Sequence, residues 1–272
     1  MASSPCRHRP LGGRAHRLCR RPCPRHRGPP RLRGLPRYQH SKALEGGYGR
    51  MTQPLTPRAM DFLMELSINN ERPWFQEHRE EFETLLHRPF KELAGETCSI
   101  MAKDFPGCGF GLHVSRIYRD ARRLFGRGPY HDHLWFSLQR EDCRNTGPML
   151  WFEFGLSGTS HGLGYWDRSA EQAAAFRKKI DSDPKRFEEL LLAVPDRDKS
   201  RLWGDEYKRP KGHYNDILDP WYNRKQASIG YDDYFGEDLF TDRLPQLLSD
   251  SFSGLVPLYH YMMEAAELEL KE

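Results

Sequence analysis

The spacing of apolar residues changes twice along this chain of 272 residues, and the change limits the folds that the chain can adopt. From residue 57 to about residue 103, apolar side chains recur at helical spacing, as Phe62 and Leu66 do. From residue 113 to residue 166 they alternate instead, which indicates half-buried strands. Helical spacing returns after Ser169. Helices, then strands, then helices predict an α+β fold.

Capping residues and prolines divide the first helical stretch into three predicted helices. The first begins at the Thr56-Pro57 pair, where a cap precedes a proline in the first turn, and it ends at Asn69-Asn70. The second begins near Arg72-Pro73 and ends or kinks at Pro89, because proline removes a helical hydrogen bond. The third helix continues to about Lys103.

The alternating stretch contains four predicted strands, and a short fifth strand follows later. Their expected ranges are 113–119, 134–138, 148–156, 161–166 and 228–231. In the third strand, Phe152 and Phe154 lie on one face, whereas Trp151 and Glu153 lie on the other. Because the connections are short, we expect an antiparallel β-meander of about four to five strands, packed on one face against N-terminal and C-terminal helices.

The C-terminal part is predicted to be helical apart from one long loop. Helices are expected from Ser169, from Asp183-Pro184, over 239–248 and over 255–268. Ser169 and Gln172 have the spacing of a capping box. Residues 203–225 follow no period and are rich in Trp, Tyr, Asp, Pro and Lys, and a long loop of this kind is often functional.

Residues 1–50 differ from the rest of the chain in charge and composition. They hold twelve Arg, one Lys and a single acid, Glu45, and so carry a formal charge of +12. They also hold seven Pro and few apolar residues, so burial cannot offset the entropy that ordering would cost. We therefore predict a disordered Arg/Pro-rich tail over 1–50 and a single globular α+β domain over 51–272.

The tail admits four interpretations. A mitochondrial leader would be Arg-rich and acid-poor, but the prolines oppose the amphipathic helix that it needs. Zinc-like spacing is present in one set of residues, His16, Cys19, Cys23 and His26. No apolar pattern flanks this set, so nothing would fold around a metal. A basic arm would bind nucleic-acid phosphates without sequence preference. The interpretation that we favour is an upstream extension ahead of a start at Met51.

The remaining 222 residues are acidic, which limits their partners. They hold 29 basic and 37 acidic side chains, a formal charge of −8, so we do not expect nucleic-acid binding by this part of the chain. Its cysteines, Cys98, Cys108 and Cys143, form no CxxC pair, which indicates reduced thiols in a cytoplasmic protein. No apolar run approaches the roughly 18 residues of a membrane span. No metal-ligand spacing or nucleotide-binding loop is present, so neither a metal nor a cofactor is predicted.

The densest group of charged residues lies between Arg116 and His131. Five arginines and one aspartate occupy residues 116–127, in a domain that is otherwise acidic. Guanidinium groups bind carboxylates and phosphates through paired hydrogen bonds, and Gly126 and Gly128 permit a tight loop whose amides could face an anion. The predicted ligand-binding residues are Arg116, Arg119, Asp120, Arg122, Arg127, Tyr130, His131 and Glu153.

An alternative interpretation of this group is structural. Asp120 could pair with its neighbouring arginines, and the other arginines could pair with acids on the helices. Glu153 would share the second face of the sheet with Trp135 and Trp151, and an arginine of residues 116–127 is its expected partner. That face is either an aromatic-lined binding site or a layer packed under the C-terminal helices.

The loop at 208–225 could complete a pocket if it folds over the arginine-rich segment. It mixes bases, acids and aromatic residues. Its single imidazole, on His213, is a candidate for acid–base chemistry only where a cleft and a partner are present.

Two sequence patterns together resemble a known family. Residues 69–75 match NNxRxWF, and residues 116–122 with Pro129-Tyr130 match RIxRDxR followed by PY. They resemble the conserved hypothetical family called domain of unknown function 2461. The resemblance covers roughly Thr56 to Ala266, including the Gly164-Tyr165-Trp166 stretch, and leaves the tail unmatched. It implies a soluble domain with no assigned activity and supplies no catalytic residue.

The chain departs from the usual pattern of that family at residues 123–127. The family pattern has a Phe-Ser-Lys-Asp-Lys-like stretch, where this chain has Arg-Leu-Phe-Gly-Arg. Phe125 and Arg127 therefore stand in the places of two lysines, and a lysine-based mechanism at position 125 is not expected here.

These observations lead to one main hypothesis and one alternative. The main hypothesis is a domain that binds a small anionic ligand, a phosphate or a carboxylate, through its Arg-rich strand and loop. In any reaction Tyr130, His131 or Glu153 would act nearby. The alternative is a non-catalytic protein-interaction module, whose partner is unknown and whose arginines form a structural network of salt bridges.

Overall fold

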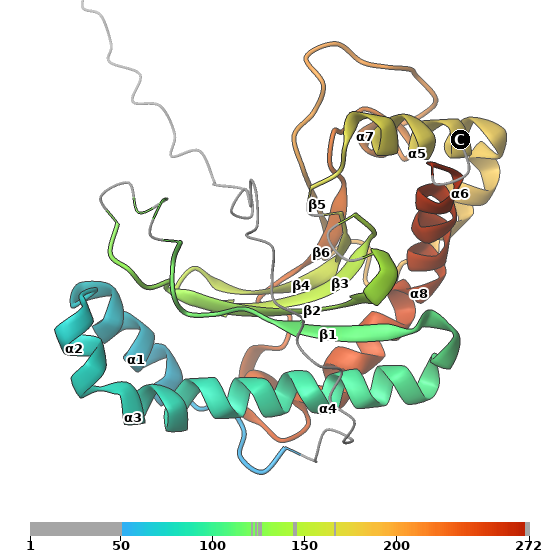
Figure 1. Cartoon of the computed structure of the whole chain (residues 1–272). Helices are drawn as coiled ribbons and strands as arrows, with labels where there is room; N and C mark the ends of the chain where they lie inside the picture. The colour runs from blue at the N-terminus through green and yellow to red at the C-terminus, as the bar shows by residue number, and fades with distance from the viewer. Residues whose placement is uncertain are drawn as a thin grey trace, which may run out of the picture. The chain divides into compact units, whose positions relative to one another are not determined.

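The computed structural model describes residues 51–120, 122, 124, 127–143, 146–165 and 167–269. The predicted disordered tail at 1–50 lies outside these residues, as do Phe125, Gly126 and Trp166. In the part described, helices, then an antiparallel sheet, then helices follow one another along the chain (Figure 1). The predicted α+β class is confirmed.

The N-terminal helices begin and end close to the predicted positions. They are α1 (Pro57–Ile68), α2 (Arg72–Glu77), α3 (Arg79–Glu81), the π-helical turn η1 (Phe82–His87) and α4 (Arg88–Asp104). Pro57 lies in the first turn of α1, where its missing N–H has no helical partner in any case. The expected break at Pro89 takes the form of η1, which comes directly before the first turn of α4.

The sheet has six antiparallel strands in the order β1-β2-β3-β4-β6-β5. Their bounds are β1 (Phe110–Val114), β2 (His133–Arg140), β3 (Met149–Gly155), β4 (Gly158–Gly164), β5 (Arg201–Trp203) and β6 (Ser228–Asp232). Strands β1 to β4 form the predicted meander, and β6 lies beside β4. The three-residue strand β5 was not predicted, because it is too short to show an alternating pattern.

The first predicted strand is shifted, because β1 ends at Val114 and does not continue to Arg119. Beyond β1 the ladder slips by two residues. Tyr118 forms an isolated bridge with Tyr130, where a regular ladder would pair it with Asp132. A slip of this kind is the effect of a β-bulge, which bends a strand and re-aims its side chains. The arginine-rich residues are therefore loop and not strand.

The remaining helices complete the C-terminal part. They are α5 (Ala170–Ser182), α6 (Pro184–Leu192), α7 (Asp219–Tyr222) and α8 (Leu244–Glu269). The capping box predicted at Ser169 and Gln172 is present, with both of its hydrogen bonds formed. Among the described residues, no helix combines the length and the apolar character that crossing a membrane requires.

The expectation of two separate C-terminal helices over 239–248 and 255–268 is wrong. A short 3₁₀ segment covers Gly236–Phe240, and α8 then runs without a break through Pro257. Pro257 is exposed, whereas its neighbour Leu258 is buried in the core. The free energy gained by burying the apolar side of α8 therefore exceeds the cost of the backbone hydrogen bond that Pro257 removes.

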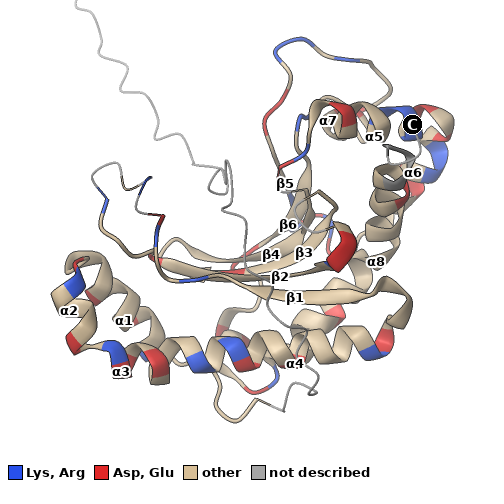
Figure 2. Ribbon diagram, in the orientation of Figure 1, with Lys and Arg blue, Asp and Glu red and all other residues tan. Residues whose placement is uncertain are grey.

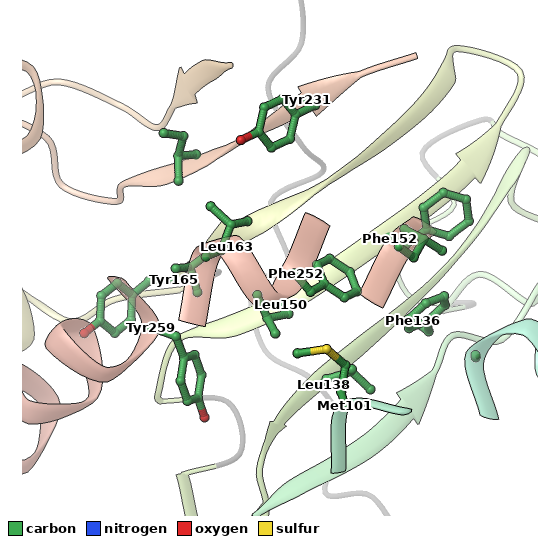
Figure 3. Close-up of a cluster of buried hydrophobic side chains, with 14 of the residues drawn as sticks. Met101, Phe136, Leu138, Leu150, Phe152, Leu163, Tyr165, Tyr231, Phe252 and Tyr259 are labelled. Carbon is green, nitrogen blue, oxygen red and sulfur yellow. The ribbon is translucent and has the colours of Figure 1, made fainter. Parts of the chain in front are cut away.

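One face of the sheet forms the core against α4 and α8. The ring of Phe90 in α4 lies 5.8 Å from that of Phe136 in β2 and 6.1 Å from that of Phe152 in β3. Phe252 of α8 belongs to the same buried cluster (Figure 3). The alternation predicted for β3 is confirmed, because Phe152 is buried while Glu153 is only partly so. Because α8 lies on the core face, it does not cover the second face, where the ring of Trp151 contacts that of Trp203 in β5.

The buried histidine of β4 gives the fold a pH dependence. His161 is 1% exposed and lies among the rings of Tyr231, Phe235 and Phe252, and its Nε2 is 2.8 Å from Ser251 Oγ. Burial lowers the pKa of His161 from 6.5 to about 3, because the charged imidazolium would lose its hydration.

We therefore expect the free energy of unfolding to decrease as the pH falls from about 6.5 towards 3. In that range the unfolded chain takes up a proton at residue 161 that the folded chain does not take up. His161→Gln should reduce the slope of unfolding free energy against pH by up to about 1.4 kcal/mol per pH unit. Urea unfolding at several pH values measures both slopes, and equal slopes in wild type and variant would contradict the prediction.

Candidate functional site

Residues 116–131, which we call the arginine segment, form an extended loop that connects β1 to β2. Two backbone hydrogen bonds hold its ends together, from Arg119 N–H to Pro129 O (2.7 Å) and from His131 N–H to Ile117 O (2.7 Å). These bonds flank the bridge between Tyr118 and Tyr130. The ends of the segment thus form a narrow antiparallel neck.

The neck is attached to the turn between α1 and α2 by the side chain of Asn70. Its Nδ2 donates to Tyr130 O (3.0 Å), and its Oδ1 accepts from Tyr130 N–H (2.9 Å). A Cβ at Gly128 would lie 2.2 Å from Asn70 Oδ1, so glycine is required for this approach. The Tyr130 ring also stacks on Phe75 of α2, with 4.1 Å between centroids. The two sequence patterns, NNxRxWF and RIxRDxR followed by PY, therefore contact each other in the structure.

A hollow of about 320 Å³, which we call the arginine hollow, lies between α2 and the arginine segment. Its lining residues are Arg72, Phe75, Gln76, Arg79, Tyr118, Arg119, Leu124, Pro129 and Tyr130. None of these described lining residues is acidic. Figure 2 shows basic positions on both the helical side and the segment.

Sequence analysis missed the helical half of this lining. The side chain of Arg79 is exposed. Arg72, Gln76 and Arg79 are spaced as i, i+4 and i+7, which places them on one side of a helix. That spacing, next to the buried Phe75, is the sequence signal that could have identified them.

The hollow has an excess of positive charge. The side chains of Arg72 and Arg79 form no hydrogen bond or ion pair with any residue that the structure describes. Arg119 donates from Nε to Tyr130 O (2.6 Å), and its Nη2 lies 3.6 Å from Asp132 Oδ1. Burial lowers the pKa of Arg119, and the charge of Arg127 lowers it further. Of the three arginines that line the hollow, Arg119 is therefore the one that has a carboxylate partner, Asp132, among the described residues.

The other predicted arginines do not converge on the hollow. Arg122 forms an exposed ion pair with Asp120, with Nε 3.1 Å and Nη2 3.0 Å from the carboxylate oxygens. Arg116 and Arg127 are exposed and do not line the hollow. Of the eight predicted ligand-binding residues, the lining includes Arg119 and Tyr130.

His131 and Glu153 lie elsewhere, beside two residues that sequence analysis missed. Asp132 Oδ1 is 2.9 Å from His133 Nδ1, and this hydrogen bond holds the pKa of Asp132 well below its usual range. Burial lowers the pKa of His131 to about 4, aided by the charges of His133 and Arg119. Asp132 and His133 gave no signal in the sequence, because an Asp-His dipeptide is common and its orientation depends on the slipped ladder.

Glu153 does not have the arginine partner that we expected. The Glu153 side chain forms no hydrogen bond or ion pair with the described residues, and the charges acting on it belong to His133 and Asp132. Burial raises the pKa of Glu153. The expectation fails because the arginine segment turns away from the sheet after Val114, so its guanidinium groups do not follow the β2–β3 ladder.

The loop at 208–225 lies against α5 and α6 and does not line the hollow (Figure 1). Asp181 of α5 accepts hydrogen bonds from the hydroxyls of Tyr214 (2.5 Å) and Tyr222 (3.1 Å). His213 pairs with Asp219 within the loop, and the His213 side chain is 84% exposed. Within the part of the chain that the structure describes, no three His, Cys, Asp or Glu side chains are grouped so that they could hold a metal ion.

We expect Asn70→Ala to lower the free energy of unfolding by about 1–3 kcal/mol, because the Tyr130 amide loses its acceptor in a partly buried place and the Tyr130 carbonyl loses one of its two donors. Amide hydrogen exchange at Tyr130 should also become faster. Asn69→Ala is the matched control, since the exposed Asn69 side chain bonds only to Glu65 O in its own helix. Urea unfolding and hydrogen exchange measure both effects, and equal losses in the two variants would show that Asn70 does not anchor the segment.

Comparison with known proteins places this geometry in a family. No curated protein matches the chain. A family model described as conserved hypothetical protein (DUF2461) matches residues 58–261, about three quarters of the sequence. The matched range contains Asn70, α2 and the whole arginine segment. The chain belongs to the DUF2461 family.

Proposed function

We propose that the protein binds a small anionic ligand, with a phosphate or carboxylate group, in the arginine hollow. The observation that carries the proposal is the lining: three guanidinium groups surround about 320 Å³, and none of the lining residues is acidic. Guanidinium groups bind both kinds of anion through paired, charge-assisted hydrogen bonds. The volume lies at the lower end of the range for small-molecule sites, which favours a metabolite over a macromolecule.

The rest of the lining favours an organic anion over a simple inorganic one. Tyr118 is 50% exposed, although it is a large aromatic side chain, and its ring packs on Phe75 and Tyr130. Leu124 and Pro129 add further apolar surface. A ligand with a flat or apolar part could cover this surface while its anionic group meets the arginines. Gln76 offers one neutral donor and acceptor beside them.

Two ion pairs favour the alternative function, a non-catalytic protein-interaction module. Arg122 is paired with Asp120, and Arg119 lies 3.6 Å from Asp132, as a structural network of salt bridges would require. Arg72 and Arg79 do not belong to such a network. The hollow is therefore the better basis for a function, and ligand binding separates the two hypotheses.

We also propose a cytoplasmic location. The three cysteines that the structure describes, Cys98, Cys108 and Cys143, are free and buried, which a reducing compartment permits. Burial raises the pKa of each of these thiols, so they are poor nucleophiles and have a packing role. The formal charge of −8 on residues 51–272 supports the absence of nucleic-acid binding by this part.

We expect at least one anion among inorganic phosphate, nucleotides, sugar phosphates and organic acids to raise the thermal stability of the protein. A ligand at a hundred times its dissociation constant stabilises the folded state by about 2.7 kcal/mol. Thermal-shift measurements at fixed ionic strength test this expectation. If no anion in the panel shifts the midpoint, the proposed function should be abandoned.

The double variant Arg72→Gln/Arg79→Gln should lose that shift and keep the midpoint of the unliganded protein, because both side chains are exposed and form no contacts in the core. Arg209→Gln is the matched control, since Arg209 is an exposed arginine in the loop against α5. Arg119 is a less suitable target, because its loss would remove one of the two donors to Tyr130 O and the ion pair with Asp132. A shift that persists in the double variant would place the ligand elsewhere.

A further inference from the structure

Four titratable side chains lie close together where β2 begins. They are His131, Asp132, His133 and Glu153. In the ladder Glu153 is opposite Trp135, two residues along β2 from His133, so His133 and Glu153 are diagonal neighbours on one face. The rings of His131 and His133 lie 4.9 Å apart. The proposed ligand in the arginine hollow makes no use of this group.

The hydrogen bond to Asp132 determines which nitrogen of His133 can accept a proton. An ionised carboxylate can only accept, so the proton of a neutral His133 ring must lie on Nδ1, 2.9 Å from Asp132 Oδ1. The lone pair is then on Nε2, which has no hydrogen bond with the described residues. This arrangement is that of an oriented general base.

Glu153 has the opposite character. It is mostly removed from water without a hydrogen-bond partner among the described residues, so its protonated form is favoured, and burial raises its pKa. A neutral carboxylic acid can donate a proton or a hydrogen bond to a developing negative charge. The geometry therefore offers Glu153 as an acid and Nε2 of His133 as a base on the same face of the sheet.

The side chains of the pair are partly open to solvent. Gly155 is opposite His133 in the ladder, and its lack of a side chain permits a close approach to His133, because a Cβ there would lie 2.4 Å from His133 Cβ. The side chain of His133 keeps 15% of its area exposed, and that of Asp132 keeps 45%. Arg127 is exposed, and its charge acts on His131. A small polar molecule can thus approach from solvent, with a cation beside the site.

We propose that this group is a general acid–base site that moves a proton on a carbon next to the carbonyl of a small polar substrate. His133 Nε2 removes the proton from that carbon, and the electron pair of the broken C–H bond forms a C=C bond. The π electrons of the carbonyl take the proton of Glu153, which gives an enol. Where the carbon that lost its proton carries a hydroxyl, the enol is an enediol. His133 then returns the proton from Nε2 to the former carbonyl carbon, and the hydroxyl of the first carbon gives its proton to the Glu153 carboxylate as a new C=O bond forms. Both residues regain their starting protonation states, so no oxidant, reductant or leaving group is required.

The contacts favour this chemistry over acyl transfer. Nucleophilic catalysis needs a hydroxyl or thiol in hydrogen-bond contact with the base. The hydrogen bond that His133 makes within the described part of the chain goes to Asp132, and no Ser, Thr or Cys in that part donates to it. Asp132 is a positioning residue, because it acts on the substrate only through His133.

The acid–base site does not rest on the ligand proposed for the arginine hollow. The two places share Arg119, which lines the hollow and contacts Asp132. Their other residues differ, because Tyr118 and Tyr130 face α2 whereas His133 and Glu153 lie on the sheet. Loss of the thermal shift and loss of proton transfer can therefore be observed separately.

The test is exchange of carbon-bound hydrogen for deuterium, which does not require the natural product to be known. The full-length protein is incubated in D₂O with dihydroxyacetone, dihydroxyacetone phosphate, glyceraldehyde and pyruvate, and deuterium in each compound is followed by proton NMR. We expect incorporation above the buffer rate for at least one compound. His133→Asn and Glu153→Gln should each reduce that rate at least about a hundredfold, as the loss of a general acid or base does.

His213→Asn is the matched control, because His213 forms the other His–Asp pair, in an exposed loop, and it should leave the exchange rate unchanged. Circular dichroism and thermal unfolding check that the variants fold. Glu153→Gln should unfold at the wild-type temperature or above it, since it removes a buried acid without a partner. If Asn at 133 does not fold, His133→Gln replaces it. Absence of protein-dependent exchange in all four compounds, or full exchange in the folded variants, would overturn the proposal.

Discussion

Burial of one sheet face against α4 and α8 is the constraint on which the rest of the structure depends. Phe136 and Phe152 on that face pack against Phe90 of α4, and Phe252 of α8 joins the same cluster (Figure 3). Because the side chains of a strand alternate, this burial also determines which residues point to the second face. Polar groups such as Glu153 can therefore lie on a rigid sheet without interrupting the core.

The slipped ladder after β1 creates both candidate sites. It turns the arginine segment out of the sheet, and Asn70 then holds the neck of that segment against the turn between α1 and α2. On one side of the neck, Tyr118 and Tyr130 meet α2 and form the wall of the arginine hollow. On the other side, His131 and Asp132 reach the start of β2. Two polar sites thus result from one irregularity in an otherwise regular sheet.

Much of the fold could be predicted, because its signals are local. The start of α1 at Pro57 and the cap at Ser169 follow from the chemistry of single residues. The predictions failed where distant packing decided the outcome. Pro257 lies within α8 because the buried side of that helix is continuous, and β5 has three residues, too few to show a period. Of the candidate site, Arg119 and Tyr130 were predicted to lie together and do line one hollow, whereas the expected arginine partner of Glu153 is not there.

The sequence by itself determined the α+β class, the meander and the segment where arginines gather, because periodicity, capping and composition are properties of neighbouring residues. Only the tertiary structure decided which of those arginines share a hollow and which residues join them. Arg72 of α2 and Arg79 of α3 lie more than 30 residues before the segment, and Glu153 lies near His133 through the register of two strands. Such contacts depend on strand register, and a slip of two residues at the end of β1 gives Tyr118 a different partner while the composition stays the same.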